Sequence, residues 1–169
     1  YLEFGCGRGE VCIYHALQGG KSTGIDYSVD AINLAIEKAK LLGASVDFVA
    51  SSFADVKLEK NRYDRILASE FIEHISADEG RKFVKIAYEA LRPGGRLLIF
   101  THPNTIQRKI GYPLVRLFKA MQGVHLPKKQ SDTLDDHYRL YHLNEQNYFE
   151  LKKLMLAFAV SILDSSESA

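Results

Sequence analysis

The chain has 169 residues, of which 46% are hydrophobic and 25% are charged, proportions typical of a single globular domain with a substantial core. Its 22 Lys and Arg residues are nearly balanced by 21 Asp and Glu residues, so no broad basic field indicates a nucleic-acid-binding protein. The longest apolar runs, such as residues 97–100, are far too short for a transmembrane segment and no secretory leader opens the chain, so we expect a cytoplasmic protein.

Strands alternate with helices along the first hundred residues. The expected strands are short, nearly continuous apolar runs: residues 1–4, 22–25, 46–50, 65–68 and 96–101. The first run reads as the last part of a buried strand, so we expect that a segment before it is missing from this chain. Such an alternation is typical of a parallel sheet covered on both faces. The sequence therefore predicts an α/β fold, a doubly wound and mostly parallel Rossmann-like sheet.

The first two helices carry start and stop signals. A glycine-rich turn at residues 5–9 leads into the first helix, which ends near Gly19. The second helix has Ser28 as its N-cap, because a serine hydroxyl accepts a hydrogen bond from a free N–H group of the first turn. Gly43 ends this helix, since glycine adopts the left-handed conformation of a C-cap.

The third helix opens with a capping box made by Ser76 and Glu79. It is expected to last to about Leu91, because residues 92–95 contain a proline and two glycines that break a helix.

The alternation pauses after the fifth strand. Residues 102–142 read as an insertion in the single domain, with a helix of their own at residues 114–121 that has Pro113 as its first residue. A further helix at residues 143–156 and a last strand at residues 158–163 are expected after it.

The expected helix within the insertion is amphipathic. Its apolar stripe is formed by Leu114, Leu117, Phe118 and Met121, and positive charge surrounds it at Arg108, Lys109, Arg116 and Lys119. Packing against the core is the simplest interpretation of this pattern. A lid over an apolar or lipid-like ligand and a helix that touches a membrane surface are the alternatives.

Residues at the ends of the first two strands indicate a nucleoside-containing ligand. In an open parallel sheet, ligands bind beyond the carboxyl ends of the strands, where Gly5, Gly7 and Gly9 allow a tight turn and a close approach. The dinucleotide fingerprint needs a glycine where this chain has Glu10, whose carboxylate is unfavourable beside a pyrophosphate. Asp26 is placed to accept hydrogen bonds from ribose hydroxyls, although NAD sites use the same device. An NAD-dependent oxidoreductase therefore stays as an alternative.

Four segments carry a family resemblance. Residues 2–9 resemble the first motif of class I methyltransferases that use S-adenosylmethionine, residues 24–28 resemble the second, and residues 91–97 resemble the segment before strand five. Residues 68–75 are similar to the segment after strand four in the branch that contains quinone-biosynthesis and many small-molecule methyltransferases. The resemblance implies transfer of a methyl group to a small-molecule or lipid-like acceptor whose pocket is shaped by the insertion. A relative that binds the cofactor without methyl transfer is the alternative.

The resemblance also implies which residues bind S-adenosylmethionine. Its methionyl part would be wrapped by the glycine-rich turn, with an acidic residue near the ammonium group, and its adenosine would lie beyond strand two. The implied residues are Glu3 near the ammonium group, Gly5, Cys6 and Gly7 around the methionyl part, Asp26 on the ribose, Tyr27 beside the adenine, and Ser69 with Glu70 on the methionyl side.

The adenine contact departs from the family pattern. Many relatives have an acidic residue after strand three, where this chain has Ser52 followed by Phe53. The Ser52 hydroxyl can still form a hydrogen bond, and the Phe53 backbone N–H could reach a ring nitrogen. Asp55 is a slightly displaced alternative.

Methyl transfer needs mainly an acceptor held in line with the reactive carbon, so a general base is optional. For a hydroxyl acceptor, His74 is the first candidate for the base, with Glu73 beside it and His102 as a third candidate. The sequence contains no recognised spacing of metal ligands, and it leaves the acceptor atom and the oligomeric state open.

Overall fold

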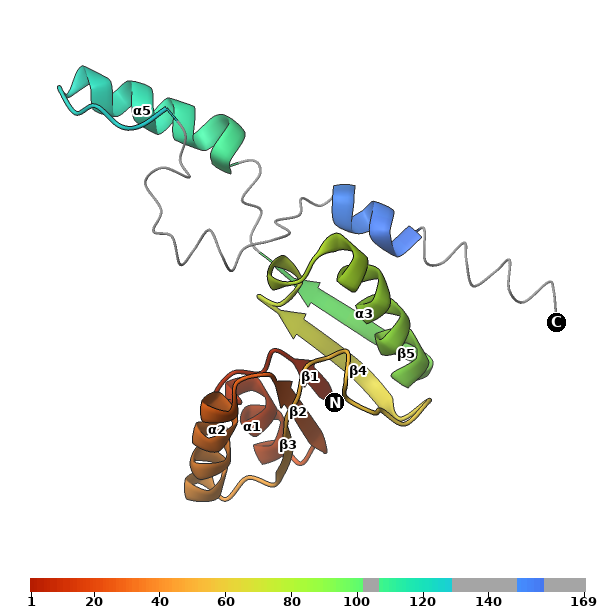
Figure 1. Ribbon diagram of the computed structural model, residues 1–169. Coiled ribbons are helices and arrows are strands. Elements are labelled where there is room, and N and C mark those ends of the chain that lie inside the picture. The colour runs from red at the N-terminus through yellow and green to blue at the C-terminus, as the bar shows by residue number, and fades with distance from the viewer. Residues whose placement is uncertain (102–106, 129–148, 157–169) are drawn as a thin grey trace, which may run out of the picture. The chain divides into compact units, whose positions relative to one another are not determined.

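A computed structural model describes residues 1–101, 107–128 and 149–156 of the chain (Figure 1). These residues divide into two compact units. The first contains residues 1–72 and 78–100, and the second contains residues 73–77 and the described residues from 101 onward. The division after residue 100 lies directly before the predicted insertion, and the arrangement of the whole chain as one domain stays a prediction.

The first unit is built on a parallel sheet of five strands in the order β3-β2-β1-β4-β5. The strands are β1 (Leu2–Phe4), β2 (Ser22–Asp26), β3 (Val46–Ala50), β4 (Tyr63–Ser69) and β5 (Leu91–Phe100). The chain order runs outward from β1 to β3 and then returns to β4 on the other side, so the strand order reverses at β1. The predicted α/β fold with a doubly wound parallel sheet is confirmed.

Helices cover both faces of this sheet, as predicted. They are α1 (Glu10–Leu17), α2 (Val29–Leu42) and α3 (Ala77–Ala90). Successive strand residues point to opposite faces. Glu3 accepts a hydrogen bond from Cys12 of α1, whereas the ring of the next residue, Phe4, meets Phe83 of α3 edge-on at 5.1 Å. Helices α1 and α3 therefore lie on opposite faces of β1.

The cap signals of α2 are confirmed. The Ser28 hydroxyl accepts a hydrogen bond from the Ala31 N–H at 3.2 Å, and Gly43 adopts a left-handed φ of 69° after the last turn. Helix α3 begins at Ala77, directly after the serine of the predicted capping box.

The start of β5 differs from the prediction. Residues 92–95 were expected to separate a helix from a strand beginning at Arg96, but β5 starts at Leu91. Leu91 pairs with Tyr63 and Arg96 pairs with Arg65, so the intervening residues form a bulge in which Gly94 has a φ of 79°. The predicted end of the helix near Leu91 is confirmed, because α3 ends at Ala90. The predicted start of the strand at Arg96 was wrong, because proline and glycine also occur in strands at bulges.

The second unit contains a single π-helical turn, η2 (Gln107–Gly111), followed by α5 (Tyr112–Met121), and a helix at residues 149–156. Helix α5 confirms the predicted helix with a proline in its first turn, two residues earlier than expected. Among the described residues, no helix is long and apolar enough to cross a membrane. His102, the start of the predicted helix at residues 143–156 and the predicted last strand lie outside the described residues.

Candidate active site

The glycine-rich turn connects β1 to α1 at the carboxyl edge of the sheet. Gly5, Gly7 and Gly9 all have positive φ values, of 68°, 52° and 73°, which side-chain-bearing residues rarely adopt. A Cβ atom at Gly9 would lie 2.5 Å from the ring of Phe48, and one at Gly5 would lie 3.2 Å from the ring of Phe71. A Cβ atom at Gly7 would meet no atom within 4 Å, so this glycine borders open space. The turn thus combines Gly9, which is buried against Phe48, with the exposed Gly5 and the partly exposed Gly7.

Hydrogen bonds to the Asp26 side chain connect the glycine-rich turn to the end of β2. Its carboxylate accepts one hydrogen bond from the Gly7 N–H at 2.8 Å and another from the Ser28 N–H at 2.9 Å, through different oxygens. The side chain lies at the edge of the buried core, with the residue 9% exposed. A carboxylate oxygen can accept two hydrogen bonds, so each oxygen keeps one lone pair for a ligand. The neighbouring Tyr27 is 74% exposed.

The segment after β3 returns to Asp26. The Ser51 N–H donates to the Asp26 backbone oxygen at 2.8 Å, which places the following turn at the same edge of the sheet. Within the turn, the Ser52 hydroxyl donates to Asp55 Oδ2 at 2.8 Å and accepts from the Ala54 N–H at 3.2 Å. The Ser52 hydroxyl is therefore occupied, and the exposed carboxylate of Asp55 is the acceptor that the turn presents.

The Phe53 side chain belongs to the core rather than to an open surface. Its ring is buried and packs edge-on against Phe71 at 5.7 Å and Phe83 at 6.1 Å. The Ser52 oxygens accept from the N–H groups of Ala54, Asp55 and Val56, not from that of Phe53. Any contact of Phe53 with a base thus comes from its backbone.

Glu3 lies between β1 and α1. Cys12 Sγ donates to Glu3 Oε2 at 3.1 Å, and only 4% of the residue is exposed. Burial raises the pKa of the Glu3 carboxyl, because the charged form loses its hydration, and burial and the nearby Glu3 raise the pKa of Tyr1. The carboxyl group is enclosed beneath the helix, so its predicted place near a cofactor ammonium group stays a prediction.

Cys6 serves the turn through its backbone. Its N–H donates to the Ile25 oxygen at 3.0 Å, and its own oxygen accepts from Gly9 at 2.8 Å. Burial raises the pKa of the Cys6 thiol to about 12, so the thiol is not a nucleophile at neutral pH.

The end of β4 also lies at the carboxyl edge of the sheet. Ser69 is half-buried, and Glu70 adopts a left-handed φ of 51° while its N–H donates to the Phe100 oxygen at 2.9 Å. Such a φ is uncommon for a residue with a side chain and is often found at functional sites. The Phe71 ring then packs against Gly5. The structure therefore brings together the glycine turn, Asp26, the turn at Ser52 and the segment at Ser69.

The candidate bases follow in the short 3-10 helix η1 (Ile72–His74). Glu73 is 1% exposed, and its carboxylate accepts a hydrogen bond from the Thr101 hydroxyl at 3.1 Å. It is thus a buried residue within the second unit rather than a solvent-facing one. His74 is exposed and belongs to the same unit.

Two hydrogen-bonding features of the site were not predicted from the sequence. It did not foresee that Asp26 holds the glycine turn, because the pattern gives no information on which N–H group a carboxylate meets. It also treated Ser52 and Asp55 as alternatives, although a serine three residues before an acidic residue is a known hydrogen-bonding pattern at the start of a turn.

Comparisons with known proteins identify the family of this chain. The model of a family described as a methyltransferase domain matches residues 2–95. A ubiquinone biosynthesis O-methyltransferase of Methylobacterium sp. (strain 4-46) is 30% identical over 106 residues, which cover 63% of this chain and 42% of that relative. The chain thus spans less than half the length of that curated relative.

Solved structures share the fold. A SAM-dependent methyltransferase from Methanosarcina mazei has a TM-score of 0.71 at 20% identity, over 93% of this chain and 77% of that one. A SAM-dependent methyltransferase from Aquifex aeolicus has a TM-score of 0.52 at 26% identity, over 58% of this chain and 53% of that one.

The family match covers more than half of the chain and includes the glycine turn, Asp26 and the segment after β4. The predicted resemblance to methyltransferases and the predicted cofactor, S-adenosylmethionine, are confirmed, and the oxidoreductase alternative is not supported. This chain belongs to the methyltransferase-domain family.

Proposed function

We propose that the protein transfers the methyl group of S-adenosylmethionine to a hydroxyl oxygen of a small, lipid-like molecule. The observation that carries the proposal is the Asp26 carboxylate, which holds the glycine turn and keeps a free lone pair on each oxygen. The hydroxyl acceptor is suggested by the similar proteins, which are O-methyltransferases of ubiquinone biosynthesis.

The residues at the carboxyl edge of the sheet match the hydrogen-bonding groups of the successive parts of S-adenosylmethionine. The free lone pairs of Asp26 suit the two ribose hydroxyls, and the open side of Gly7 suits the methionyl part. The Asp55 carboxylate suits the amino group of adenine, with the Phe53 N–H for a ring nitrogen. Ser69 and the strained backbone at Glu70 border the methionyl side.

The proposed reaction needs no covalent bond between the protein and the substrate. The cofactor supplies a methyl carbon that its sulfonium group has already activated. The chain's contribution is to hold the acceptor oxygen in line with that carbon and to exclude competing nucleophiles. Transfer to a hydroxyl oxygen would release the hydroxyl proton, and the exposed imidazole of His74 is the proposed general base that would accept it.

Two measurements test this function. The first is calorimetric titration with S-adenosylhomocysteine, with NAD as the control ligand. The second is transfer of a labelled methyl group from S-adenosylmethionine to a panel of phenols that differ in the length of an apolar tail.

Saturable binding of S-adenosylhomocysteine without binding of NAD, together with methylation that improves with tail length, is the expected result. Binding without transfer to any phenol would instead identify a cofactor-binding relative. No binding by a folded protein would contradict the proposal.

A further inference from the structure

The Phe71 side chain packs against the first glycine of the glycine-rich turn. The three atoms nearest to a Cβ atom built at Gly5 all belong to Phe71, at 3.2, 3.4 and 3.7 Å. Gly5 itself is exposed, whereas Phe71 is half-buried. An exposed piece of backbone at the edge of the sheet is therefore supported by one aromatic side chain.

The residues after this glycine are held from the other side of β1. The Cys6 N–H donates to the Ile25 oxygen at 3.0 Å, and the Gly7 N–H donates to the Asp26 carboxylate at 2.8 Å. Both acceptors belong to β2, whereas Phe71 follows β4, which pairs with β1 on the opposite side. Hydrogen bonds from one neighbouring strand and an apolar contact from the other thus position the turn.

Other phenylalanine rings hold Phe71 in place. Its ring centre lies 5.0 Å from that of Phe83, 5.7 Å from that of Phe53 and 6.0 Å from that of Phe4. These separations are typical of favourable aromatic pairs. The three neighbours come from α3, from the turn after β3 and from β1. Packing against several elements fixes the ring, as the support of a binding site requires.

The backbone at Glu70 turns the chain toward this position. Glu70 has a φ of 51°, and its N–H donates to the Phe100 oxygen at 2.9 Å. A left-handed residue with a side chain is strained and persists only where the surrounding structure holds it. The packed ring of the next residue, Phe71, supplies such a constraint.

We infer that Phe71 is a positioning residue that holds Gly5 in place for the methionyl half of S-adenosylmethionine. A loop that already has its bound conformation loses less freedom when the ligand binds, so the ring contributes affinity without touching the ligand. The inference rests on the proposed function, which places the methionyl part beside the glycine-rich turn.

The adenosine half of the proposed site is less dependent on this ring. The turn after β3 is held by hydrogen bonds of its own, from the Ser51 N–H to the Asp26 oxygen and from the Ser52 hydroxyl to Asp55. Removal of the Phe71 ring should therefore affect the two halves of the cofactor site unequally.

Calorimetric titration of the whole chain with two ligands tests this difference. S-adenosylhomocysteine contains both halves, whereas methylthioadenosine lacks the amino-acid part. We expect Phe71→Ala to weaken binding of S-adenosylhomocysteine by about tenfold and binding of methylthioadenosine by less than about twofold. Phe71→Leu keeps more of the apolar volume and should show a smaller loss, of about threefold, again for S-adenosylhomocysteine. It carries the test if Phe71→Ala does not fold.

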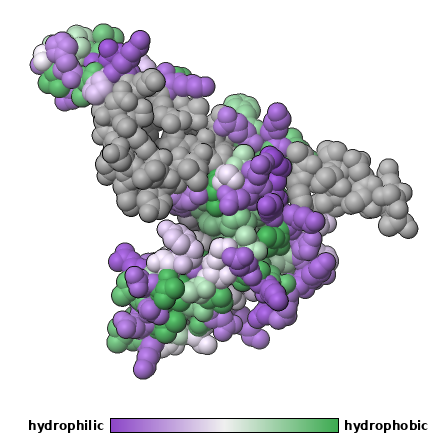
Figure 2. Space-filling view, viewed as in Figure 1, coloured by the Kyte–Doolittle hydropathy of each residue, from purple (hydrophilic) through white to green (hydrophobic). Residues whose placement is uncertain are grey.

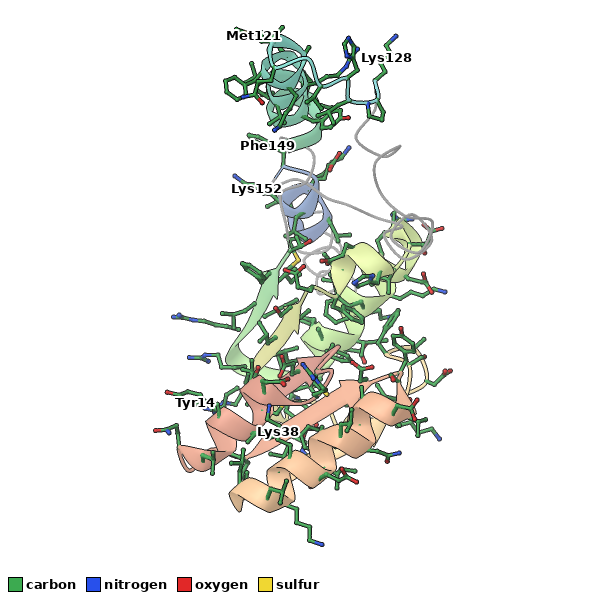
Figure 3. All side chains as sticks on the ribbon, turned by 90° about the vertical axis from the view of Figure 1, so that its left-hand side faces the viewer. Tyr14, Lys38, Met121, Lys128, Phe149 and Lys152 are labelled. Atoms are coloured by element: carbon green, nitrogen blue, oxygen red, sulfur yellow. The ribbon has the colours of Figure 1, made fainter. Side chains whose placement is uncertain are left out.

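Two control variants separate this role from general packing. Phe83→Leu changes another ring of the same group and should lower the free energy of unfolding, with S-adenosylhomocysteine bound within about twofold of the wild type. Tyr14→Ala removes an aromatic side chain that is 66% exposed on α1, on the other face of the sheet (Figure 3). Exposed apolar side chains also lie on α2, where Figure 2 shows them among hydrophilic ones, so exposure alone does not mark the site. Tyr14→Ala should bind both ligands as the wild type does, and urea unfolding checks that each variant is folded.

Unchanged affinity for S-adenosylhomocysteine in the Phe71 variants would overturn the inference, as would equal weakening of both ligands. A loss in Phe83→Leu as large as that in Phe71→Leu would overturn it too, because loosening of the core would then explain the effect. Failure of the wild type to bind S-adenosylhomocysteine would instead contradict the proposed function. The inference alone fails when the wild type binds and the Phe71 variants bind equally well, so the two failures are distinct.

Discussion

The Asp26 side chain has a structural role and a proposed role in ligand binding. The sequence predicts it on a ribose, because it follows a strand beside a glycine turn. The structure adds that both of its oxygens accept backbone hydrogen bonds, from Gly7 and Ser28. A carboxylate can do this and still meet two hydroxyls, whereas an amide side chain offers only one acceptor oxygen.

We therefore expect Asp26→Ala to lower both affinity and stability. Loss of charge-assisted hydrogen bonds to the ribose should weaken S-adenosylhomocysteine binding by about tenfold or more. The Gly7 and Ser28 N–H groups would lose their acceptor, at a cost of about 1–3 kcal/mol in the free energy of unfolding. Calorimetry and urea unfolding measure the two effects. The exposed Asp30 on α2 provides the control variant Asp30→Ala, and unchanged affinity in Asp26→Ala would contradict the assignment.

The base contact can be tested through the amino group of adenine itself. If Asp55 accepts from that group, Asp55→Asn should weaken binding of S-adenosylhomocysteine by about tenfold. The inosine analogue carries an oxygen at this position, so Asp55→Asn should not weaken its binding.

Two further variants make this test specific. Ser52→Ala should have a smaller effect of the same sign, because it releases the Asp55 carboxylate without removing it. Asp47→Asn changes another exposed carboxylate, on β3, and should bind both ligands as the wild type does. Equal loss for the two ligands in Asp55→Asn would contradict the proposed contact.

At the scale of elements, the glycines of the site are required for two separable reasons. Gly9 needs its left-handed φ and also lies against the Phe48 ring, where a Cβ atom would be 2.5 Å from Cζ. Gly43 has a similar φ of 69°, but a Cβ atom there would meet nothing within 4 Å. A comparison of substitutions at Gly9 and Gly43 therefore separates the cost of backbone strain from the cost of steric crowding.

Gly43→Ala should accordingly lower the free energy of unfolding by about 1 kcal/mol, the cost of a left-handed residue with a side chain. Gly9→Ala should cost about 1–3 kcal/mol more, because the Phe48 ring has to move. Urea unfolding of the two variants measures the difference. Equal losses of unfolding free energy in the two variants would mean that the Phe48 ring can move without an energetic penalty. The glycine turn would then tolerate a side chain at residue 9.

Local signals at element ends explain what could be predicted. Ser28 and Gly43 define α2 because capping chemistry acts within one turn of the chain. The bulge that opens β5 could not be predicted, since it depends on pairing of Leu91 with Tyr63 far away in sequence. The apolar stripe of α5 is visible as a pattern in the sequence, and its packing against the core stays a prediction because α5 and the sheet belong to different units.

At the scale of the whole molecule, the fold of the first unit was predictable because strands and helices alternate along the first hundred residues. The candidate site was predictable only where strand ends fix it, as for Asp26 and the glycine turn. Side-chain partners such as Cys12 for Glu3 depend on how layers pack, which no single segment encodes.

The packing of Glu3 predicts how stability of the whole chain depends on pH. Burial raises the pKa of Glu3, so the folded chain holds this proton more tightly than the unfolded chain does. Stability from this group is therefore present at low pH and is lost as pH rises through the raised pKa. Glu3→Gln keeps an oxygen that can accept from Cys12 and has no charge to bury. We expect the variant to be more stable than the wild type near pH 8, with the difference shrinking toward pH 5.

Glu10 supplies a control of opposite sign. The Lys38 ammonium, 2.9 Å from the Glu10 carboxylate, lowers the pKa of Glu10, so stability from this pair is present at neutral pH and is lost as pH falls. Because both side chains are partly exposed, Glu10→Gln should cost at most about 1 kcal/mol at neutral pH. Urea unfolding at several pH values measures both variants. Parallel pH profiles for Glu3→Gln and the wild type would mean that Glu3 is hydrated rather than enclosed by α1.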